Sequence, residues 1–370
     1  MNKSNSNVDF PLRAVLLQPD TAAGYDLGQW DLLVQQARGA GLLARVAALL
    51  READLGDRIP PEVRWHLNSA FTVYRAHSDD VRLEVEHIAR ALKPAGVRPV
   101  LLKGAAYLAA GDRARLGRLY SDVDIFVPRD HIDAVEQLLR WQGWSGEELS
   151  AYDQAYYRRW MHEIPPLIHR SRGIALDVHH NLLPLTSRVK LDAEALAAGI
   201  TPSDFPGVDV LAPSDRVLHS AAHLLLEGEF DNAFRDLSDL YLLLTELSAA
   251  DPGFWDALPA RAAELGLSRV LYYALRYLAQ LLDLAVPPDV TARLQSAAPV
   301  APVRWIMDRL FASALLPIAV TGQGGWPGFA RFALYLRSHY LKMPLPLLAR
   351  HLWHKAVITP FEYRQPDPAA

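Results

Sequence analysis

The chain has 370 residues, of which 51% are hydrophobic and 22% charged, and its net charge is −4. This balance is typical of a protein with a sizeable core and does not indicate a chain that binds nucleic acid or membrane along its whole length. The absence of cysteine excludes disulfides, thiolate metal sites and a cysteine nucleophile. The opening residues lack a secretory signal, and no apolar run reaches the roughly 20 residues that span a bilayer. We therefore expect a cytoplasmic protein with no membrane partner.

Helical periodicity dominates residues 1–93, which we predict to be an N-terminal helical region. The segments DLLVQQARGAGLLARVAALL and VRLEVEHIARALK place apolar residues at i, i+3, i+4 and i+7. Ser78-Asp79-Asp80 precedes the second segment, and short oxygen-bearing side chains accept hydrogen bonds from the free N–H groups of a helix start. The sequence therefore predicts that a helix begins there.

Residues 94–205 change to alternating strand and helix patterns. VRPVLL and DVDIFV predict strands, and a helical pattern follows each of them. IPPLIHR and IALDVHH predict a strand pair joined around Ser171-Arg172-Gly173. This region is therefore expected to be an α+β core with a small mixed β-sheet.

Residues 206–358 return to helical periodicity, and the proline-rich residues 359–370 are expected to form a flexible tail. The glycine-rich segment 322–328 predicts a loop. The closing segment FARFALYLRSHYLKMPLPLLARHLWHKA is basic and amphipathic, which fits docking to nucleic acid, membrane or a partner as well as packing on the core. The sequence does not decide between these alternatives.

Two carboxylates one residue apart stand out in the strand pattern DVDIFV. Because strand side chains alternate, Asp122 and Asp124 point to one face and Val123 and Ile125 to the other. Neighbouring carboxylates repel each other unless a cation lies between them, and Mg²⁺ prefers such oxygen ligands. The pair therefore indicates a metal site, with a structural pairing to nearby arginines as the alternative.

A third carboxylate, Asp177, lies in the strand pattern IALDVHH. Three carboxylates on adjacent strands can hold two divalent ions about 4 Å apart, the arrangement used in phosphoryl and nucleotidyl transfer. His179 and His180 follow directly and are either further metal ligands or an ordinary packed pair. His219 and His223 have the spacing of a zinc protease motif, but Ser220 stands where that motif needs glutamate.

The segment VLLKGAAYL has the form of a phosphate-binding turn. A strand ends at Lys103, Gly104 allows close backbone approach, and a helix begins, so that free N–H groups face any bound anion. A P-loop pattern is absent. Lys103 and the arginines of the connection to Asp122 provide positive charge next to this turn.

Taken together, LLKGAAYL, GRLYSDVDIFV and ALDVHH resemble the nucleotidyltransferase fold of the DNA polymerase β superfamily. More narrowly, they resemble its bacterial family of uncharacterised nucleotidyltransferases, and the likeness covers most of residues 30–245. The resemblance implies a polymerase β-type α+β core flanked by N- and C-terminal helical units. One departure is Gly104-Ala105, where the superfamily usually has Gly-Ser or Gly-Gly; Ser121 or Lys103 would then supply the missing phosphate contact.

The resemblance also implies roles for particular residues of this chain. The predicted catalytic and metal-binding residues are Asp122, Asp124 and Asp177. The predicted nucleotide-binding residues are Lys103, Gly104, Ala105, Arg118 and Ser121. Candidates for the pocket wall are His179, His223, Arg235 and Asp239, although Arg235, Asp236 and Asp239 are also consistent with an ordinary salt-bridged helix face.

The predicted function is a metal-dependent nucleotidyl transfer. An NTP, with ATP favoured, would give its NMP group to an acceptor and release pyrophosphate, using Mg²⁺ or Mn²⁺. A small molecule, peptide or protein is favoured as acceptor over nucleic acid because the chain is acidic overall. The alternatives are a catalytically weak nucleotide-binding regulator or scaffold, and a metal-dependent phosphohydrolase.

Overall fold

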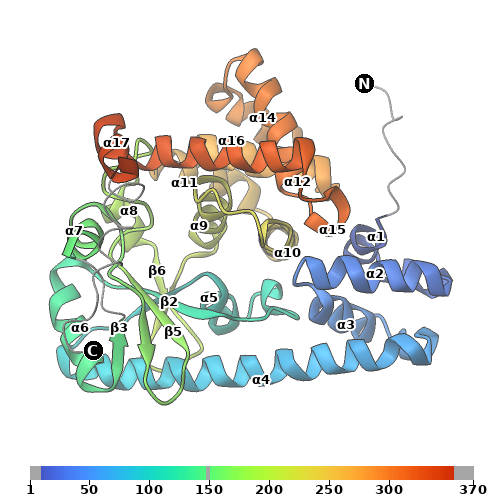
Figure 1. The fold of residues 1–370 in the computed structure, drawn as a ribbon, viewed down its shortest axis with the longest axis horizontal. Coiled ribbons are helices and arrows are strands. Elements are labelled where there is room, and N and C mark those ends of the chain that lie inside the picture. The colour runs from blue at the N-terminus through green and yellow to red at the C-terminus, as the bar shows by residue number, and fades with distance from the viewer. Residues whose placement is uncertain (1–9, 147–150, 354–370) are drawn as a thin grey trace, which may run out of the picture.

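The computed structural model describes residues 10–146 and 151–353 (Figure 1). The tail predicted for residues 359–370 lies outside the described residues. The N-terminal region folds as helices, as the periodicity predicts. Their bounds are α1 (Pro11–Leu17), α2 (Leu27–Gly39), α3 (Leu43–Glu52) and α4 (Pro61–Leu92).

Helix α4 corrects one prediction, because no helix begins at Ser78. A single helix runs from Pro61 to Leu92 along the lower edge of the molecule in Figure 1. The Ser78 hydroxyl donates to the Tyr74 carbonyl at 2.9 Å, which is a bond within the helix and not a cap. Buried residues lie on both sides of this point, with Val63 and Leu67 before it and Val81 and Val85 after it, so both halves of one helix pack on the protein.

The sheet is mixed and has the strand order β3-β4-β5-β2-β1-β7-β6. This confirms the predicted α+β class with a mixed sheet between helices. Strand β2 runs antiparallel to β1 and parallel to β5, and β4 and β5 form the expected antiparallel pair. The bounds are β1 (Val100–Leu102), β2 (Asp122–Phe126), β3 (Trp144–Gly146), β4 (Leu167–His169), β5 (Ala175–His179), β6 (Ile200–Pro202) and β7 (Asp209–Leu211).

The two faces of the sheet have opposite characters. Val123, Ile125 and Val178 are fully buried in the cluster that also contains apolar residues of α4 and of α6 (Ile132–Trp141). Asp122 and Asp124 alternate with these valines and isoleucines and therefore lie on the opposite face. The strand pattern thus separates a dry packing face from a face that carries carboxylates.

Helices of the second half cover the carboxylate-bearing side of the sheet, and α16 crosses above them in Figure 1. Their bounds are α7 (Ala151–Trp160), α8 (Ala193–Ala198), α9 (Pro213–Leu226), α10 (Ala233–Ala250), α11 (Phe254–Glu264), α12 (Ser268–Leu281), α13 (Pro288–Arg293), α14 (Ala301–Ala314), α15 (Ile318–Thr321), α16 (Gly325–Lys342) and α17 (Leu345–Trp353). Among the described helices, none has the length and apolar character needed to cross a membrane.

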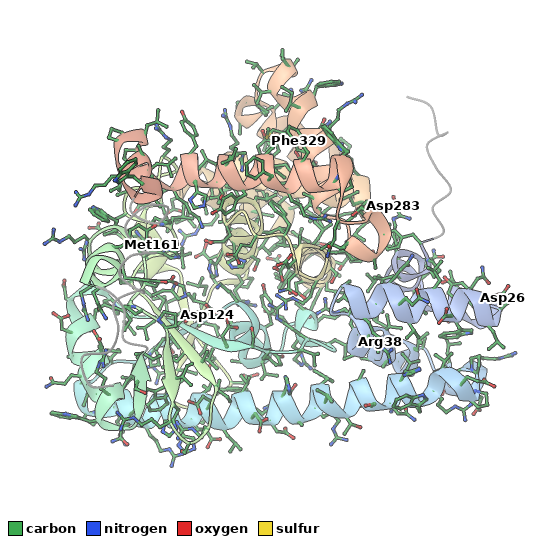
Figure 2. The ribbon with its side chains drawn as sticks, in the orientation of Figure 1. Asp26, Arg38, Asp124, Met161, Asp283 and Phe329 are labelled. Atoms are coloured by element: carbon green, nitrogen blue, oxygen red, sulfur yellow. The ribbon has the colours of Figure 1, made fainter. Side chains whose placement is uncertain are left out.

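Helix α16 corrects the loop predicted for residues 322–328. The helix begins at Gly325, so the loop prediction is wrong for the second half of that segment. Pro327 is compatible with this start because the first turn of a helix needs no N–H donors. Figure 2 shows Phe329 on this helix, well separated from Asp124, which lies among the strands in the left half of the view.

Candidate active site

The strand register brings the three predicted carboxylates together. Asp124 of β2 is aligned with Asp177 of the neighbouring parallel strand β5. Asp122 lies two residues before Asp124 on the same face, and one ligand oxygen from each of the three carboxylates lies within 4.8 Å of the others. The expectation that they share one face of adjacent strands is confirmed, and the cluster presents only the hard oxygen donors that suit Mg²⁺ or Mn²⁺.

Asp124 is the most enclosed of the three, with 3% of its surface exposed. Its Oδ1 atom accepts from Lys103 Nζ at 2.8 Å and lies 3.0 Å from His179 Nε2. Burial alone would raise the pKa of Asp124, but the charge of Lys103 and the bond to His179 outweigh it and hold the pKa well below its usual range. Both contacts are made to Oδ1, which leaves Oδ2 to serve as a metal ligand.

Lys103 is engaged with Asp124 in this structure. Burial acts to lower the pKa of Lys103, but the charge and hydrogen bond of Asp124 outweigh burial, so the pKa is raised. The ammonium is therefore positively charged and lies against Asp124 Oδ1. Its predicted contact with a phosphate remains a prediction.

The pKa of Asp177 reflects its burial and the neighbouring carboxylates. Burial, followed by the charges of Asp124 and Glu163, raises the pKa of Asp177 to about 7. A divalent ion bound between these groups would oppose that repulsion. The electrostatics of the cluster thus agree with its donor chemistry.

The turn between β1 and α5 (Lys103–Ala110) is tightly constrained. Lys103 has a φ of +46°, a left-handed conformation that is uncommon outside glycine and is often kept at functional sites. A Cβ added to Gly104 would lie 2.9 Å from Arg118 Nε and 3.0 Å from Tyr120 Cδ1. Glycine is required here because the Arg118 and Tyr120 side chains pack directly against the start of the helix.

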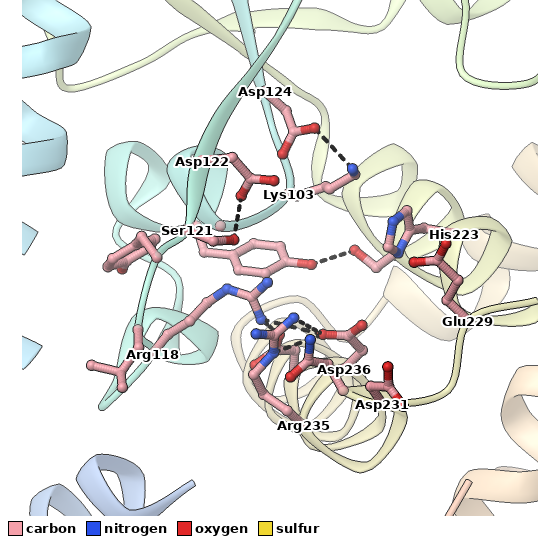
Figure 3. Close-up of a pocket in the computed structure, with 17 residues that line it drawn as sticks. Lys103, Arg118, Ser121, Asp122, Asp124, His223, Glu229, Asp231, Arg235 and Asp236 are labelled. Carbon is pink, nitrogen blue, oxygen red and sulfur yellow. Dashed lines mark hydrogen bonds and ion pairs between the residues drawn. The ribbon is translucent and has the colours of Figure 1, made fainter. Parts of the chain in front are cut away.

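The first turn of α5 opens onto a polar cavity, shown in Figure 3. Its N–H groups have no acceptors within the helix, as at every helix start, and they can face a bound anion. The cavity is lined by Lys103, Gly104, Tyr107, Arg118, Leu119, Tyr120, Ser121, Asp122, Asp124, Ser220, His223, Glu229, Asp231, Asn232, Arg235, Asp236 and Asp239. Carboxylates outnumber cationic side chains six to three in this wall. A triphosphate would meet net negative charge here unless divalent cations entered with it.

Most of the residues singled out from the sequence lie in this wall. The exceptions are Ala105, which is buried in the first turn of α5, Asp177, which lies beside the cavity, and His179. His179 was predicted as a possible wall residue, but it lies behind Asp124, where its ring is 3% exposed. It reaches the cavity only through its bond to Asp124.

His223 lies in the wall on α9. Burial, and then the charge of Lys103, lowers the pKa of its ring to about 4, so it is neutral near pH 7. His219 is buried one turn earlier on the same helix. Because glutamate is absent from position 220, this pair does not form a zinc protease site.

Arg118 is held by a buried ion-pair network. Its guanidinium contacts the carboxylate of Asp239 and lies 3.6 Å from Asp236, both on α10. Arg45 of α3 reaches the other oxygen of Asp239 at 2.7 Å and is completely buried. Arg235 pairs with its neighbour Asp236 at 2.9 Å. Arg235, Asp236 and Asp239 therefore line the cavity. Their ion pairs are to a sequence neighbour or to arginines of other elements, not the i, i+4 pairs of an ordinary salt-bridged helix face.

Arg45 is a residue that the sequence reasoning missed. It also donates to the carbonyls of Leu116 and Ala114, which brace the connection that carries Arg118. In the sequence it is one basic residue within an amphipathic helix, far from Asp239. Nothing in its local pattern distinguishes it from a solvent-exposed arginine.

Comparison with known proteins agrees with this geometry. The family model described as uncharacterised nucleotidyltransferase matches residues 26–283. The chain belongs to this family, and membership supports nucleotidyl transfer as its general activity. The matched region includes the strands with the three carboxylates and helical elements on both sides. No curated protein and no solved structure matches the chain.

Proposed function

We propose that this protein is a metal-dependent nucleotidyltransferase that moves an NMP group from an NTP, with ATP favoured, to an acceptor. The observation that carries this proposal is the meeting of Asp122, Asp124 and Asp177 beside a cavity that begins at the first turn of α5. Hard oxygen ligands and a helix start then lie next to each other. This is the combination that a metal-bound triphosphate needs.

The reaction forms one bond and breaks one bond. A nucleophilic oxygen or nitrogen of the acceptor attacks the α-phosphorus, the bond from that phosphorus to the bridging oxygen breaks, and pyrophosphate leaves. The proton of the nucleophile passes to a nearby base or to water. Asp177 is the candidate base because it lies beside Asp124 at the edge of the cavity.

Asp122, Asp124 and Asp177 would hold Mg²⁺, with Mn²⁺ as the alternative. When bound, such ions neutralise the charge of the triphosphate and stabilise the charge that develops during transfer. Arg118 and the N–H groups after Lys103 would position the phosphates, and Ser121 lies next to Asp122 at the same edge. The Lys103 ammonium would be free to turn to a phosphate once a cation neutralises Asp124.

The charge of the cavity rim favours a small molecule, peptide or protein as the acceptor. Glu229 and Asp231 line the cavity and are exposed on the loop between α9 and α10. These carboxylates would repel the phosphate backbone of a nucleic acid, whose binding depends on lysine and arginine contacts. A neutral or cationic acceptor fits this rim better.

The test is a thermal denaturation series with ATP, GTP, CTP and UTP, each with and without Mg²⁺. A ligand that binds only the folded state raises the midpoint. We expect one NTP to do so only with Mg²⁺, and we expect Asp122→Asn to abolish the shift. Asp130→Asn is the matched control, because Asp130 is an exposed aspartate outside the cavity. Release of pyrophosphate and labelling of a candidate acceptor from α-labelled NTP would then identify the transfer.

The other outcomes separate the alternatives. A Mg²⁺-dependent shift, with NTP left intact after long incubation with a panel of acceptors, would favour a nucleotide-binding regulator. Phosphate release from simple phosphoesters without NTP would favour a phosphohydrolase. A chain that shows no shift with any NTP in the presence of Mg²⁺ or Mn²⁺ would contradict nucleotidyl transfer.

A further inference from the structure

A second cluster of potential metal ligands lies behind Asp124, away from the cavity. It consists of His162, Glu163 and His179, each of which offers one ligand atom within 4.8 Å of the others. Glu163 faces His179 of β5 through an isolated antiparallel bridge, which fixes the two backbones side by side. The rings of His162 and His179 lie 5.3 Å apart between centroids.

The contacts of His179 are difficult to satisfy with a neutral ring. Its Nε2 atom lies 3.0 Å from Asp124 Oδ1, and its Nδ1 atom lies 3.3 Å from Glu163 Oε2. A neutral imidazole carries one N–H and one lone pair, so it can donate to only one of these carboxylates. Its lone pair would then face the other carboxylate, which is repulsive unless a second proton or a cation lies between them.

His162 provides a second, independent observation at this cluster. The side chain is 6% exposed, and its Nδ1 atom is buried without a hydrogen-bond partner. A buried polar atom without a partner is costly, and a bound cation would accept the lone pair of an unprotonated nitrogen.

We propose that His162, Glu163 and His179 form a second divalent-cation site, of the zinc class, distinct from the site of Asp122, Asp124 and Asp177. Two imidazole nitrogens and one carboxylate are a three-ligand set that zinc uses, with a fourth position left for water. Nitrogen donors favour zinc-like ions over Mg²⁺, which selects oxygen.

Through the bond from His179 to Asp124, the proposed cation would help to hold Asp124 in position. With Nδ1 bound to the cation, Nε2 carries the proton and donates it to Asp124 Oδ1. Metal-bound histidines typically donate their second N–H to a carboxylate in this way, which fixes the ring orientation. The cation would therefore hold His179, and His179 would hold Asp124, so His162 and Glu163 are positioning residues for the cavity.

Cobalt(II) is the probe for this site because it replaces zinc and absorbs visible light in a low-coordinate nitrogen and oxygen environment. The parent protein carries Asp122→Asn and Asp177→Asn, which remove two ligands of the oxygen-only site. The result therefore does not depend on whether the proposed function is correct. After treatment with a chelator, the parent is titrated with Co²⁺. We expect a visible band that saturates at one equivalent and that Zn²⁺ removes by competition.

Three further variants locate the site. We expect His162→Ala and Glu163→Gln to lose the band, and His180→Ala to retain it. His180 is the matched control, since it neighbours His179 and also has a buried Nδ1 without a partner, but it is not in the cluster. A parent without the band, or a band that persists in both His162→Ala and Glu163→Gln, would overturn the proposal.

If these variants fail to fold, a nitrogen-15 NMR spectrum of the histidines in the folded parent tests the second metal site instead. With one equivalent of Zn²⁺, we expect His179 to show one protonated and one metal-bound nitrogen. Two protonated nitrogens on His179 under the same conditions would mean that the ring is an imidazolium between two carboxylates. That result would overturn the second metal site while leaving nucleotidyl transfer untouched.

Discussion

Two buried aspartates of this protein make the same number of contacts to basic groups but have different kinds of partners. Asp239 is 1% exposed and contacts Arg45 and Arg118. Asp124 is 3% exposed and contacts Lys103 and His179. A guanidinium is always charged, whereas an ammonium can move away on its flexible stem and an imidazole can lose its proton. The partners of Asp239 are permanent, and those of Asp124 can be exchanged.

The positions of the partners match this difference. Arg45 lies on α3 and Asp239 on α10, so their ion pair joins the first helices to the second half of the chain across the connection that carries Arg118. Lys103 directly follows β1, and His179 is the last residue of β5, so both come from elements next to Asp124 in the sheet. One network therefore joins distant parts of the chain, and the other holds Asp124, the proposed metal ligand, through partners that can be exchanged.

The largest effect is expected for Asp239→Asn. The substitution removes the charge opposite Arg45, whose side chain is fully buried, and Arg118, which is 9% exposed. Breaking a buried ion pair by removing one partner costs about 3–5 kcal/mol, because an uncompensated charge remains inside. Urea denaturation should therefore show a loss of unfolding free energy in this range. The exposed Asp231→Asn is the matched control and should change it by less than about 0.5 kcal/mol.

A smaller loss is expected for Asp124→Asn in chelator-containing buffer. The Lys103 side chain is 20% exposed, so its ammonium can turn to water, and the loss should be about 1.5–3 kcal/mol, the range for a hydrogen bond to a charged group. The Mg²⁺-dependent shift with NTP should disappear at the same time. If Asp124→Asn destabilised the chain as much as Asp239→Asn, the distinction between exchangeable and permanent partners would be wrong.

The aspartates of the candidate site are easier to predict from the sequence than the contacts that surround them. Asp122, Asp124 and Asp177 could be predicted because each lies in a strand pattern where alternation fixes the face and flanking apolar residues fix the burial. The sequence also predicts the turn at Gly104, but it does not show why glycine is required there. The approach of Arg118 and Tyr120 to Gly104 depends on tertiary packing across a long connection.

The parts of the fold that the sequence does not predict also depend on tertiary packing. Ser78 has the local features of a helix start, and only the packing of α4 on both sides of Ser78 shows that the helix is uninterrupted. Strands β3, β6 and β7 are each three residues long and contain Gly146, Pro202 or Asp209, residue types that are depleted in strands, so no strand pattern marks them. The partnership of Arg45 with Asp239, and the position of His179 behind Asp124, depend on which elements meet in space. A single sequence does not contain that information in a local form.

Lys103→Met tests the exchange at Asp124 directly. The methionine keeps most of the side-chain volume but removes the charge that competes with a cation for Asp124. We expect the affinity for Mg²⁺ alone to rise by about tenfold, which corresponds to about 1.4 kcal/mol, and the affinity for Mg²⁺-NTP to rise less or to fall. Isothermal titration of both ligands measures the two effects. Lys93→Met, at an exposed lysine outside the cavity, is the control, and a lower Mg²⁺ affinity in Lys103→Met would contradict the exchange.

The smallest effect concerns Glu227, whose carboxylate lies 2.7 Å from Lys342 and joins the end of α9 to α16. Burial would raise the pKa of Glu227, but the charges of Lys342 and His223 outweigh it and lower the pKa to about 2. A carboxyl group with a depressed pKa stabilises the fold above its unfolded value of about 4.3, and this contribution is lost as the pH falls towards 2.

Wild type should therefore exceed Glu227→Gln in unfolding free energy by about 1 kcal/mol at pH 6, and the difference should shrink at pH 3.5. Urea denaturation at the two pH values measures it, with the exposed Glu86→Gln as the control. The Glu227–Lys342 pair is partly exposed, so Lys342 can turn to water as Lys103 can. Among the described residues, Glu227 is not part of a group that could hold a metal ion. A difference that grew as the pH fell would mean that Lys342 does not set the charge state of Glu227.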